Sequence, residues 1–144
     1  MLSQKARYAL HALIVLAEHG GSEPMQIVDI ADSARVPRKF LEQILVELKK
    51  RGIVQSIRGR AGGYLLGRAP RDVSFAEIIR AIDGPLALSP CVSATAYHKC
   101  ADCDDEATCA IRKVLLAARD ATAEILESRS LASALKPRRR NRAA

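Results

Sequence analysis

The chain has 144 residues, enough for one domain with its own hydrophobic core and one appendage, and its aromatic content of 3% argues against a stacking platform for single-stranded nucleic acid. The net charge of +7 is divided unevenly: residues 1–71 carry 12 basic and 6 acidic side chains, residues 72–135 carry 6 and 10, and residues 136–144 carry 5 and none. A basic first half and a basic end indicate a polyanionic partner, although the same charges also suit an ordinary solvated surface.

The first predicted element is a helix over about residues 4–19. Gly20 and Gly21 end it, and its apolar side chains recur at helical spacing, at Ala6, Leu10, Leu13, Ile14 and Ala17. The basic start and apolar run loosely resemble a signal peptide, but His11 interrupts the run and no convincing small-residue cleavage site follows. No stretch approaches the roughly 20 apolar residues that span a bilayer. We therefore expect a cytoplasmic protein without a membrane partner.

Two shorter helices follow, and together they predict a helix-turn-helix. The first ends where Pro37 forces a turn, and its apolar face is formed by Ile27, Ile30, Ala31 and Ala34. Pro37 can serve as the first residue of the second helix, because its fixed φ suits that position. This second helix runs to Gly52 and has its buried stripe at Leu41, Ile44, Leu45 and Leu48. Its outer face is polar and basic, and carries Arg38, Lys39, Glu42, Gln43 and Lys49.

A short β-hairpin is predicted next. Residues 53–57 and 64–66 are rich in β-forming side chains, and the glycine-rich residues 58–63 between them permit the positive φ angles of a hairpin tip. Arg58 and Arg60 lie at this tip, where they have no role in a core, so we interpret the hairpin as a wing. The alternatives are an ordinary surface hairpin and a phosphate-binding glycine loop, and the second is disfavoured because no helix starts after Gly63.

Two further helices are predicted, one on each side of a long loop. The first covers about residues 75–82 and begins with a capping box, in which Ser74 and Glu77 cap each other's backbone N–H groups. The second covers about residues 110–128, and its apolar stripe runs through Ile111, Val114, Leu115, Ala118, Thr122, Ile125 and Leu126. This stripe must be buried, either against a second copy of the chain or against the first helix of the same chain.

All four cysteines lie in the loop between these helices, at Cys91, Cys100, Cys103 and Cys109. In a reducing compartment such a group is more consistent with metal binding or redox chemistry than with disulfides. Thiolates suit both iron-sulfur clusters and zinc, and the spacing alone does not separate the two. A metal-free thiol switch and an inert loop are further alternatives. Against the switch, the acidic neighbours Asp102, Asp104, Asp105 and Glu106 disfavour a free thiolate.

Several motifs together resemble the Rrf2 family of bacterial transcription regulators. They occur in the family's order from residue 1 to about 135: Arg7-Tyr-Ala9, Phe40-Leu-Glu-Gln43, Gly52-Ile-Val-Gln-Ser56-Ile-Arg-Gly59 with Gly62-Gly-Tyr-Leu65, Glu77-Ile-Ile-Arg-Ala-Ile-Asp83 and the late cysteines. The resemblance implies a winged helix-turn-helix homodimer with a long dimerisation helix. In many members it also implies an iron-sulfur cluster held by cysteines between the fourth helix and that long helix.

The resemblance assigns three of the cysteines directly. Cys91, Cys103 and Cys109 match the family's pattern, Cys100 is additional, and Arg112 stands where some members have a histidine ligand. Cys100 is the preferred fourth ligand and His98 the alternative, ahead of the neighbouring aspartates. Other members recruit an acidic residue from the partner's first helix, where this chain has Arg7 and Tyr8, so we expect a cluster held within one subunit. We expect [2Fe-2S] in preference to [4Fe-4S], with zinc as the alternative.

The expected function is a homodimeric DNA-binding regulator that senses iron, oxygen, nitric oxide or redox state. Arg, Lys and Gln donate to base edges in the major groove and to flanking phosphates, which suits Arg38, Lys39, Gln43 and Lys49 on one helix face together with Glu42. Arg58 and Arg60 would take the wing to the minor groove or the backbone. A homodimer implies a two-fold related operator in double-stranded DNA.

An enzyme or an electron carrier is disfavoured. The chain has only His11, His19 and His98 for a Cys/His hydrolase, and a ferredoxin-like carrier would not need the winged part. We therefore expect a mainly α fold with a small β-wing: a winged helix-turn-helix domain at 1–84, a cysteine-rich loop at 85–109, a dimerisation helix at 110–135 and a basic tail at 136–144. The tail either adds phosphate affinity or only aids solubility.

Overall fold

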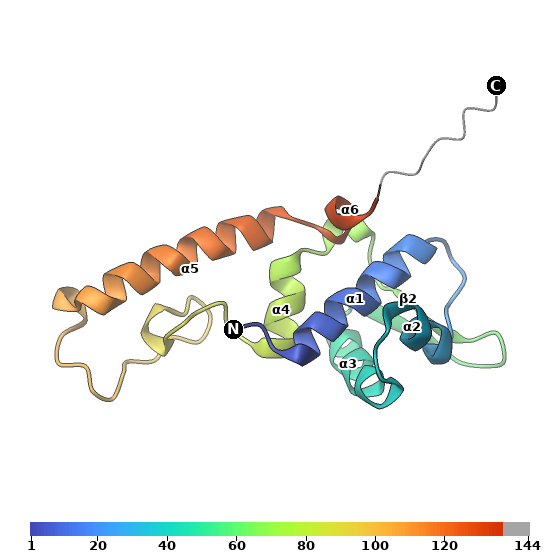
Figure 1. Cartoon of the computed structure of the whole chain (residues 1–144), viewed down its shortest axis with the longest axis horizontal. Coiled ribbons are helices and arrows are strands. Elements are labelled where there is room, and N and C mark those ends of the chain that lie inside the picture. The colour runs from blue at the N-terminus through green and yellow to red at the C-terminus, as the bar shows by residue number, and fades with distance from the viewer. Residues whose placement is uncertain (137–144) are drawn as a thin grey trace, which may run out of the picture.

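The computed structural model describes residues 1–136, and its helices and strands follow the predicted order (Figure 1). The elements are α1 (Gln4–His19), α2 (Ile27–Ala34), α3 (Arg38–Lys50), β1 (Val54–Ile57), β2 (Gly63–Leu66), α4 (Phe75–Asp83), α5 (Ala110–Ser128) and α6 (Leu131–Ala134). The predicted fold class, mainly α with a small two-stranded sheet, is confirmed. The predicted basic tail lies outside the described residues apart from Lys136. No helix in the described part is long and apolar enough to cross a membrane.

The hydrophobic core lies where α1, α2 and α3 pack together and is closed by α4 and α6. Its fully buried side chains include Leu13 of α1, Ile30 of α2 and Ile78 of α4, together with the predicted stripe of α3 at Leu41, Ile44, Leu45 and Leu48. Each such side chain stabilises the fold by about 1.5–3 kcal/mol relative to exposure. The core therefore holds the polar face of α3 outward in a fixed orientation.

The turn between α2 and α3 is three residues long, as a helix-turn-helix requires. Arg35 ends α2 in the left-handed conformation, with φ 55°, and its N–H bonds back to the last turn of the helix. The prediction that Pro37 is the first residue of the next helix was wrong by one position. Its ψ of 130° is extended, so Pro37 stands at the cap, and its carbonyl accepts from Phe40 and Leu41 at the start of α3.

The predicted wing is present as an antiparallel pair with Val54 opposite Leu66 and Ile57 opposite Gly63. A second attachment holds it to the segment before α2. Met25 N donates to Tyr64 O at 2.8 Å, and Tyr64 N donates to Met25 O at 2.7 Å. The wing is therefore fixed relative to the helix-turn-helix, although its tip remains exposed.

Gly63 is the tightest point of this attachment. Its φ is 149°, and a Cβ there would lie 2.2 Å from Met25 O. Gly63→Ala is expected to lower the free energy of unfolding by more than the roughly 1–3 kcal/mol that backbone strain alone costs, as measured by urea denaturation. Gly59→Ala is the matched control, because Gly59 also has a positive φ, 110°, but faces open space. Equal stability of the two variants would contradict the packing argument.

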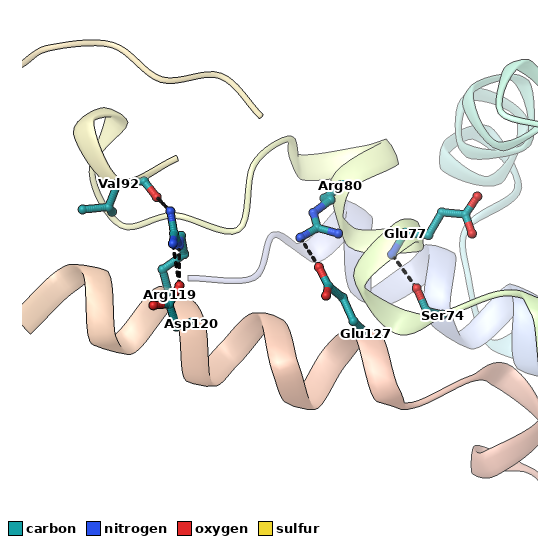
Figure 2. A network of polar contacts seen from close by, with 7 residues as sticks. All are labelled: Ser74, Glu77, Arg80, Val92, Arg119, Asp120 and Glu127. Atoms are coloured by element: carbon teal, nitrogen blue, oxygen red, sulfur yellow. Dashed lines mark hydrogen bonds and ion pairs between the residues drawn. The ribbon is translucent and has the colours of Figure 1, made fainter. Parts of the chain in front are cut away.

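The capping box at α4 is half formed. Ser74 Oγ accepts from Glu77 N at 3.1 Å, as predicted. The reciprocal bond was predicted wrongly: the Glu77 carboxylate points away from the cap in Figure 2 and forms an ion pair with Arg68 instead. An arginine brought close by the tertiary fold offers this carboxylate a charged partner, which the local backbone N–H does not.

Helix α5 extends away from the winged domain with the cysteine-rich loop beside it (Figure 1), and none of its residues is buried. The predicted helix 110–128 is confirmed, but the rest of the segment 110–135 does not continue it. The chain becomes extended at Arg129, and Leu131 of α6 inserts into the core with no exposed surface. Phe75 N donates to Arg129 O, and Leu131 N to Val73 O, both at 2.9 Å. The end of α5 is thereby anchored beside α4.

Candidate functional site

The four predicted cysteines line one open cavity of about 550 Å³ between the loop and the start of α5. We call it the cysteine cavity. All four are free thiols, and the remaining wall is formed by Ser89, Asp102, Asp104, Asp105, Thr108, Ile111, Arg112 and Leu115. The fold thus brings together Cys91 and Cys109, which are 18 positions apart in the chain. His98, the alternative ligand, is exposed and is not part of this wall.

Local structure places each cysteine in the wall. The 3-10 turn Pro90–Val92, here called the Cys91 turn, buries Cys91 to 7% exposure. Ser89 Oγ lies 3.4 Å from Cys91 Sγ and 3.4 Å from Cys100 Sγ, so the two sulfurs share one hydroxyl neighbour. Cys103 N donates to Cys100 O at 3.1 Å in a tight turn. Cys109 is the N-cap residue of α5 and lies at the positive end of the helix dipole.

The four thiols form a donor set that fits an iron-sulfur cluster. Within the described residues, no three His, Cys, Asp or Glu side chains converge closely enough to hold one metal ion. A cluster contains several iron atoms and accepts thiolates spread around it, whereas zinc requires four donors at about 2.0–2.3 Å from one point. Four thiols around one cavity are thus a donor set for a thiolate-ligated metal group.

The electrostatics disfavour a reactive free thiol at Cys103. Loss of solvation raises the pKa of the Cys103 thiol, and the negative charges of Cys109, Glu106 and Cys100 add to this rise against the opposing charge of Lys99. A thiol with a raised pKa is poorly ionised at neutral pH and reacts slowly. A bound metal would drive its deprotonation, so the same thiol can still serve as a ligand.

Two arginines of α5 hold the Cys91 turn, and the sequence prediction missed this contact. Arg119 Nη1 donates to Val92 O at 2.7 Å (Figure 2), and Arg112 Nη2 donates to Cys91 O at 3.4 Å. Because 7 residues are close to two helical turns, both side chains leave the same side of α5. The seven-residue spacing of Arg112 and Arg119 was the one signal of this contact in the sequence. It shows that the two side chains share a side of the helix, but not which segment they contact.

Helix α5 is also tied to the winged domain. Arg80 Nη2 on α4 lies 2.7 Å from Glu127 Oε1 on α5, and Figure 2 shows this pair two turns further along from Arg119. Both side chains are partly exposed, so the pair contributes little stability on its own. Together with the backbone bonds at Arg129, it fixes where the end of α5 sits on the domain.

The predicted DNA-binding side chains of α3 are all exposed on one face, here called the reading face: Arg38, Lys39, Glu42, Gln43 and Lys49. Arg38 Nε lies 3.5 Å from Glu42 Oε1, an exposed pair one turn apart. Arg58 and Arg60 are exposed at the wing tip, where Gln26 Nε2 donates to Arg60 O at 3.5 Å. Arg35, in the turn before α3, is also exposed and has a left-handed backbone.

Comparison with known proteins agrees with this arrangement. Residues 2–137 match the family model described as "Rrf2: Iron-dependent Transcriptional regulator". The Rrf2 resemblance is confirmed. The chain belongs to the Rrf2 family. A regulator named rrf2-like from Rhodobacter capsulatus is 53% identical over 117 residues, which cover 79% of this chain and 78% of that protein.

Solved structures of Rrf2 regulators share the fold. The structure of CymR, the global cysteine regulator of B. subtilis, has a TM-score of 0.76 and 33% identity and covers 93% of this chain and 95% of that one. The IscR of T. potens has a TM-score of 0.71 and 29% identity, with 93% and 85% covered. This Rrf2 chain is thus a DNA-binding helix-turn-helix transcription regulator, and the family's function confirms the prediction that it is not an enzyme.

Proposed function

We propose that this protein is a homodimeric Rrf2 regulator, acting on chromosomal DNA in the cytoplasm, that holds an iron-sulfur cluster in the cysteine cavity. Cys91, Cys103 and Cys109 are the proposed ligands, with Cys100 as the fourth, and [2Fe-2S] is preferred over [4Fe-4S]. The observation that carries the proposal is that all four thiols of the chain line one cavity at the start of α5. When bound, the cluster supplies a centre sensitive to iron supply, oxygen, nitric oxide or redox state.

The exposed side of α5 supports a dimer. Ile111, Val114 and Ile125 are 70%, 69% and 61% exposed, although they are large apolar side chains. Val114 and Ile125 follow Ile111 by 3 and 14 residues. At 3.6 residues per turn, these spacings place all three side chains on one side of the helix. A second copy of α5 would cover this stripe. The alternative prediction was that α1 of the same chain buries this stripe, and α1 does not do so.

The reading face and the wing supply the DNA contacts. Arg38 and Gln43 project from α3 toward the proposed major-groove position, while Lys39 and Lys49 suit flanking phosphates. Arg58 and Arg60 extend the contact from the wing to the minor groove or the backbone. With two subunits, the operator is two-fold related, and its half-sites are about one helical turn, or a multiple of it, apart.

Coupling between the two sites follows the polar contacts of α5. A change at the cysteine cavity moves the Cys91 turn, which Arg112 and Arg119 hold against α5. If α5 shifts, α4 and the winged domain move with it, because α4 contacts the end of α5 through Arg80 and through the backbone at Arg129. The spacing of two reading faces in a dimer would change with the angle of α5. Regulation then requires that the two cluster states differ in operator affinity.

Arg119→Gln tests this route. The variant loses the bond to Val92 O but keeps the cysteines and the reading face, so cluster content and DNA binding should persist. The ratio of operator Kd values between the cluster-loaded and cluster-free protein, measured by fluorescence anisotropy, is expected to shrink by at least about fivefold. Lys113→Gln removes an exposed charge from the same helix and should leave the ratio unchanged. An unchanged ratio in Arg119→Gln would refute the role of this contact.

The proposed function is tested by purifying the full chain without oxygen and recording its visible spectrum, iron, sulfide and zinc. Footprinting then compares operator binding before and after cluster removal, and sedimentation gives the oligomeric state. Iron and sulfide in a dimer with state-dependent operator binding is the expected result. Zinc without sulfide, or no metal at all, would instead favour a zinc or metal-free member controlled by a protein partner or small molecule.

A further inference from the structure

Arg112 has an unusual position in the wall of the cysteine cavity. Its Nε is buried and has no hydrogen-bond partner among the residues that the structure describes. The guanidinium carries five N–H donors, and within residues 1–136 it makes one hydrogen bond, from Nη2 to Cys91 O, which is long at 3.4 Å. A buried donor without a partner costs free energy and calls for an explanation. A sulfur-rich group in the adjoining cavity would offer acceptors to the N–H groups of this guanidinium that line the cavity.

The charge of the cavity indicates the same kind of occupant. Its wall holds four cysteines and three aspartates, Asp102, Asp104 and Asp105, and Arg112 is the one cation among the wall residues described. When the thiols are ionised by a bound group, this guanidinium faces a strongly negative centre. Arg112 cannot be a ligand itself, because a guanidinium stays protonated in proteins and has no acceptor atom.

We propose that Arg112, which lines the cysteine cavity, donates a guanidinium N–H to a sulfur of the bound cluster and thereby raises the cluster's reduction potential. Hydrogen bonds to the sulfurs and the local net charge are among the properties that set such potentials. Reduction adds one electron to the cluster from an external reductant. No bond is made or broken at Arg112, which stays protonated and stabilises the more negative, reduced form. This inference rests on the proposed iron-sulfur function.

The test is an anaerobic redox titration of the full-length protein with dithionite and mediator dyes, followed by visible absorption. Arg112→Met removes the charge and the donors, Arg112→Gln keeps an N–H donor without the charge, and Arg112→Lys keeps the charge. At a given applied potential, the ratio of reduced to oxidised cluster in the methionine variant is expected to be at least about tenfold lower than in wild type. This corresponds to a reduction potential lower by about 59 mV for a one-electron step.

The glutamine variant is expected to fall between methionine and wild type, and the lysine variant to stay nearer wild type than methionine does. Lys113→Met, an exposed cation on the next residue, serves as the control and should not shift the potential. If the Arg112→Met variant carries the cluster and has the same reduction potential as wild type, the inference is wrong. If methionine prevents cluster loading, the glutamine variant decides by the same comparison. Wild-type protein without iron and sulfide refutes the proposed function, and this inference with it.

Discussion

Cys91→Ala is expected to abolish the visible chromophore of the anaerobically purified protein. Cys91 is the most buried of the four cysteines. Arg112 and Arg119 of α5 donate hydrogen bonds to the main-chain carbonyls of its turn. Loss of a direct ligand should lower metal affinity by more than the roughly 10–100-fold that loss of an outer-shell partner costs. Iron and sulfide analysis beside the absorption spectrum measures the effect.

The other cysteines provide matched comparisons. Cys103→Ala and Cys109→Ala are expected to behave like Cys91→Ala, because all three line the cavity and match the family's pattern. Cys100→Ala is expected to lose the cluster as well, whereas His98→Ala should retain it, since His98 is exposed and outside the cavity wall. Full chromophore in Cys91→Ala would contradict the ligand assignment, and loss of it in His98→Ala alone would move the fourth ligand to the histidine.

Arg38→Ala is expected to weaken binding to the protein's own operator strongly while leaving the fold intact. Its side chain is 61% exposed and, among the described residues, forms an ion pair with the exposed Glu42 alone, so its removal costs little stability. A lost base contact costs about 1–3 kcal/mol, and a dimer loses it twice, so the free energy of operator binding should weaken by about 2–6 kcal/mol. Gln43→Ala should act in the same way, through a different base.

Competition assays separate the two kinds of contact. Arg38→Ala and Gln43→Ala should reduce the preference for operator over random duplex DNA, because base contacts carry specificity. Lys49→Ala should weaken binding to both operator and random DNA. It should also reduce the slope of log affinity against log salt concentration by about 0.9 per lost phosphate contact. Lys113→Ala removes an exposed cation from α5, outside the reading face, and should change neither the operator preference nor the overall affinity. Operator affinity in Arg38→Ala equal to wild type would show that the reading face is assigned to the wrong side chains.

The helices were predictable because their signals are local. The periodic apolar residues of α1 and α3 report a buried stripe at 3.6-residue spacing, and the Ser74 cap bonds a group three residues away. The wing was predictable because its glycines occupy positions that other residues avoid. Contacts between distant segments were missed: Leu131 in the core, Glu77 with Arg68, and Arg119 with Val92.

The sequence by itself determined the chemical groups: four soft thiolate donors, a basic polar face on one helix, and two arginines at the tip of a glycine-rich hairpin. The tertiary structure alone decided that the four thiols line one cavity, that His98 stands outside it, and that Arg112 is part of the same wall with its Nε buried and unpaired among the described residues. The physical reason is distance along the chain. Residues that lie 9 to 21 positions apart in a loop meet only when both ends of that loop are held, here by α4 and by the arginines of α5.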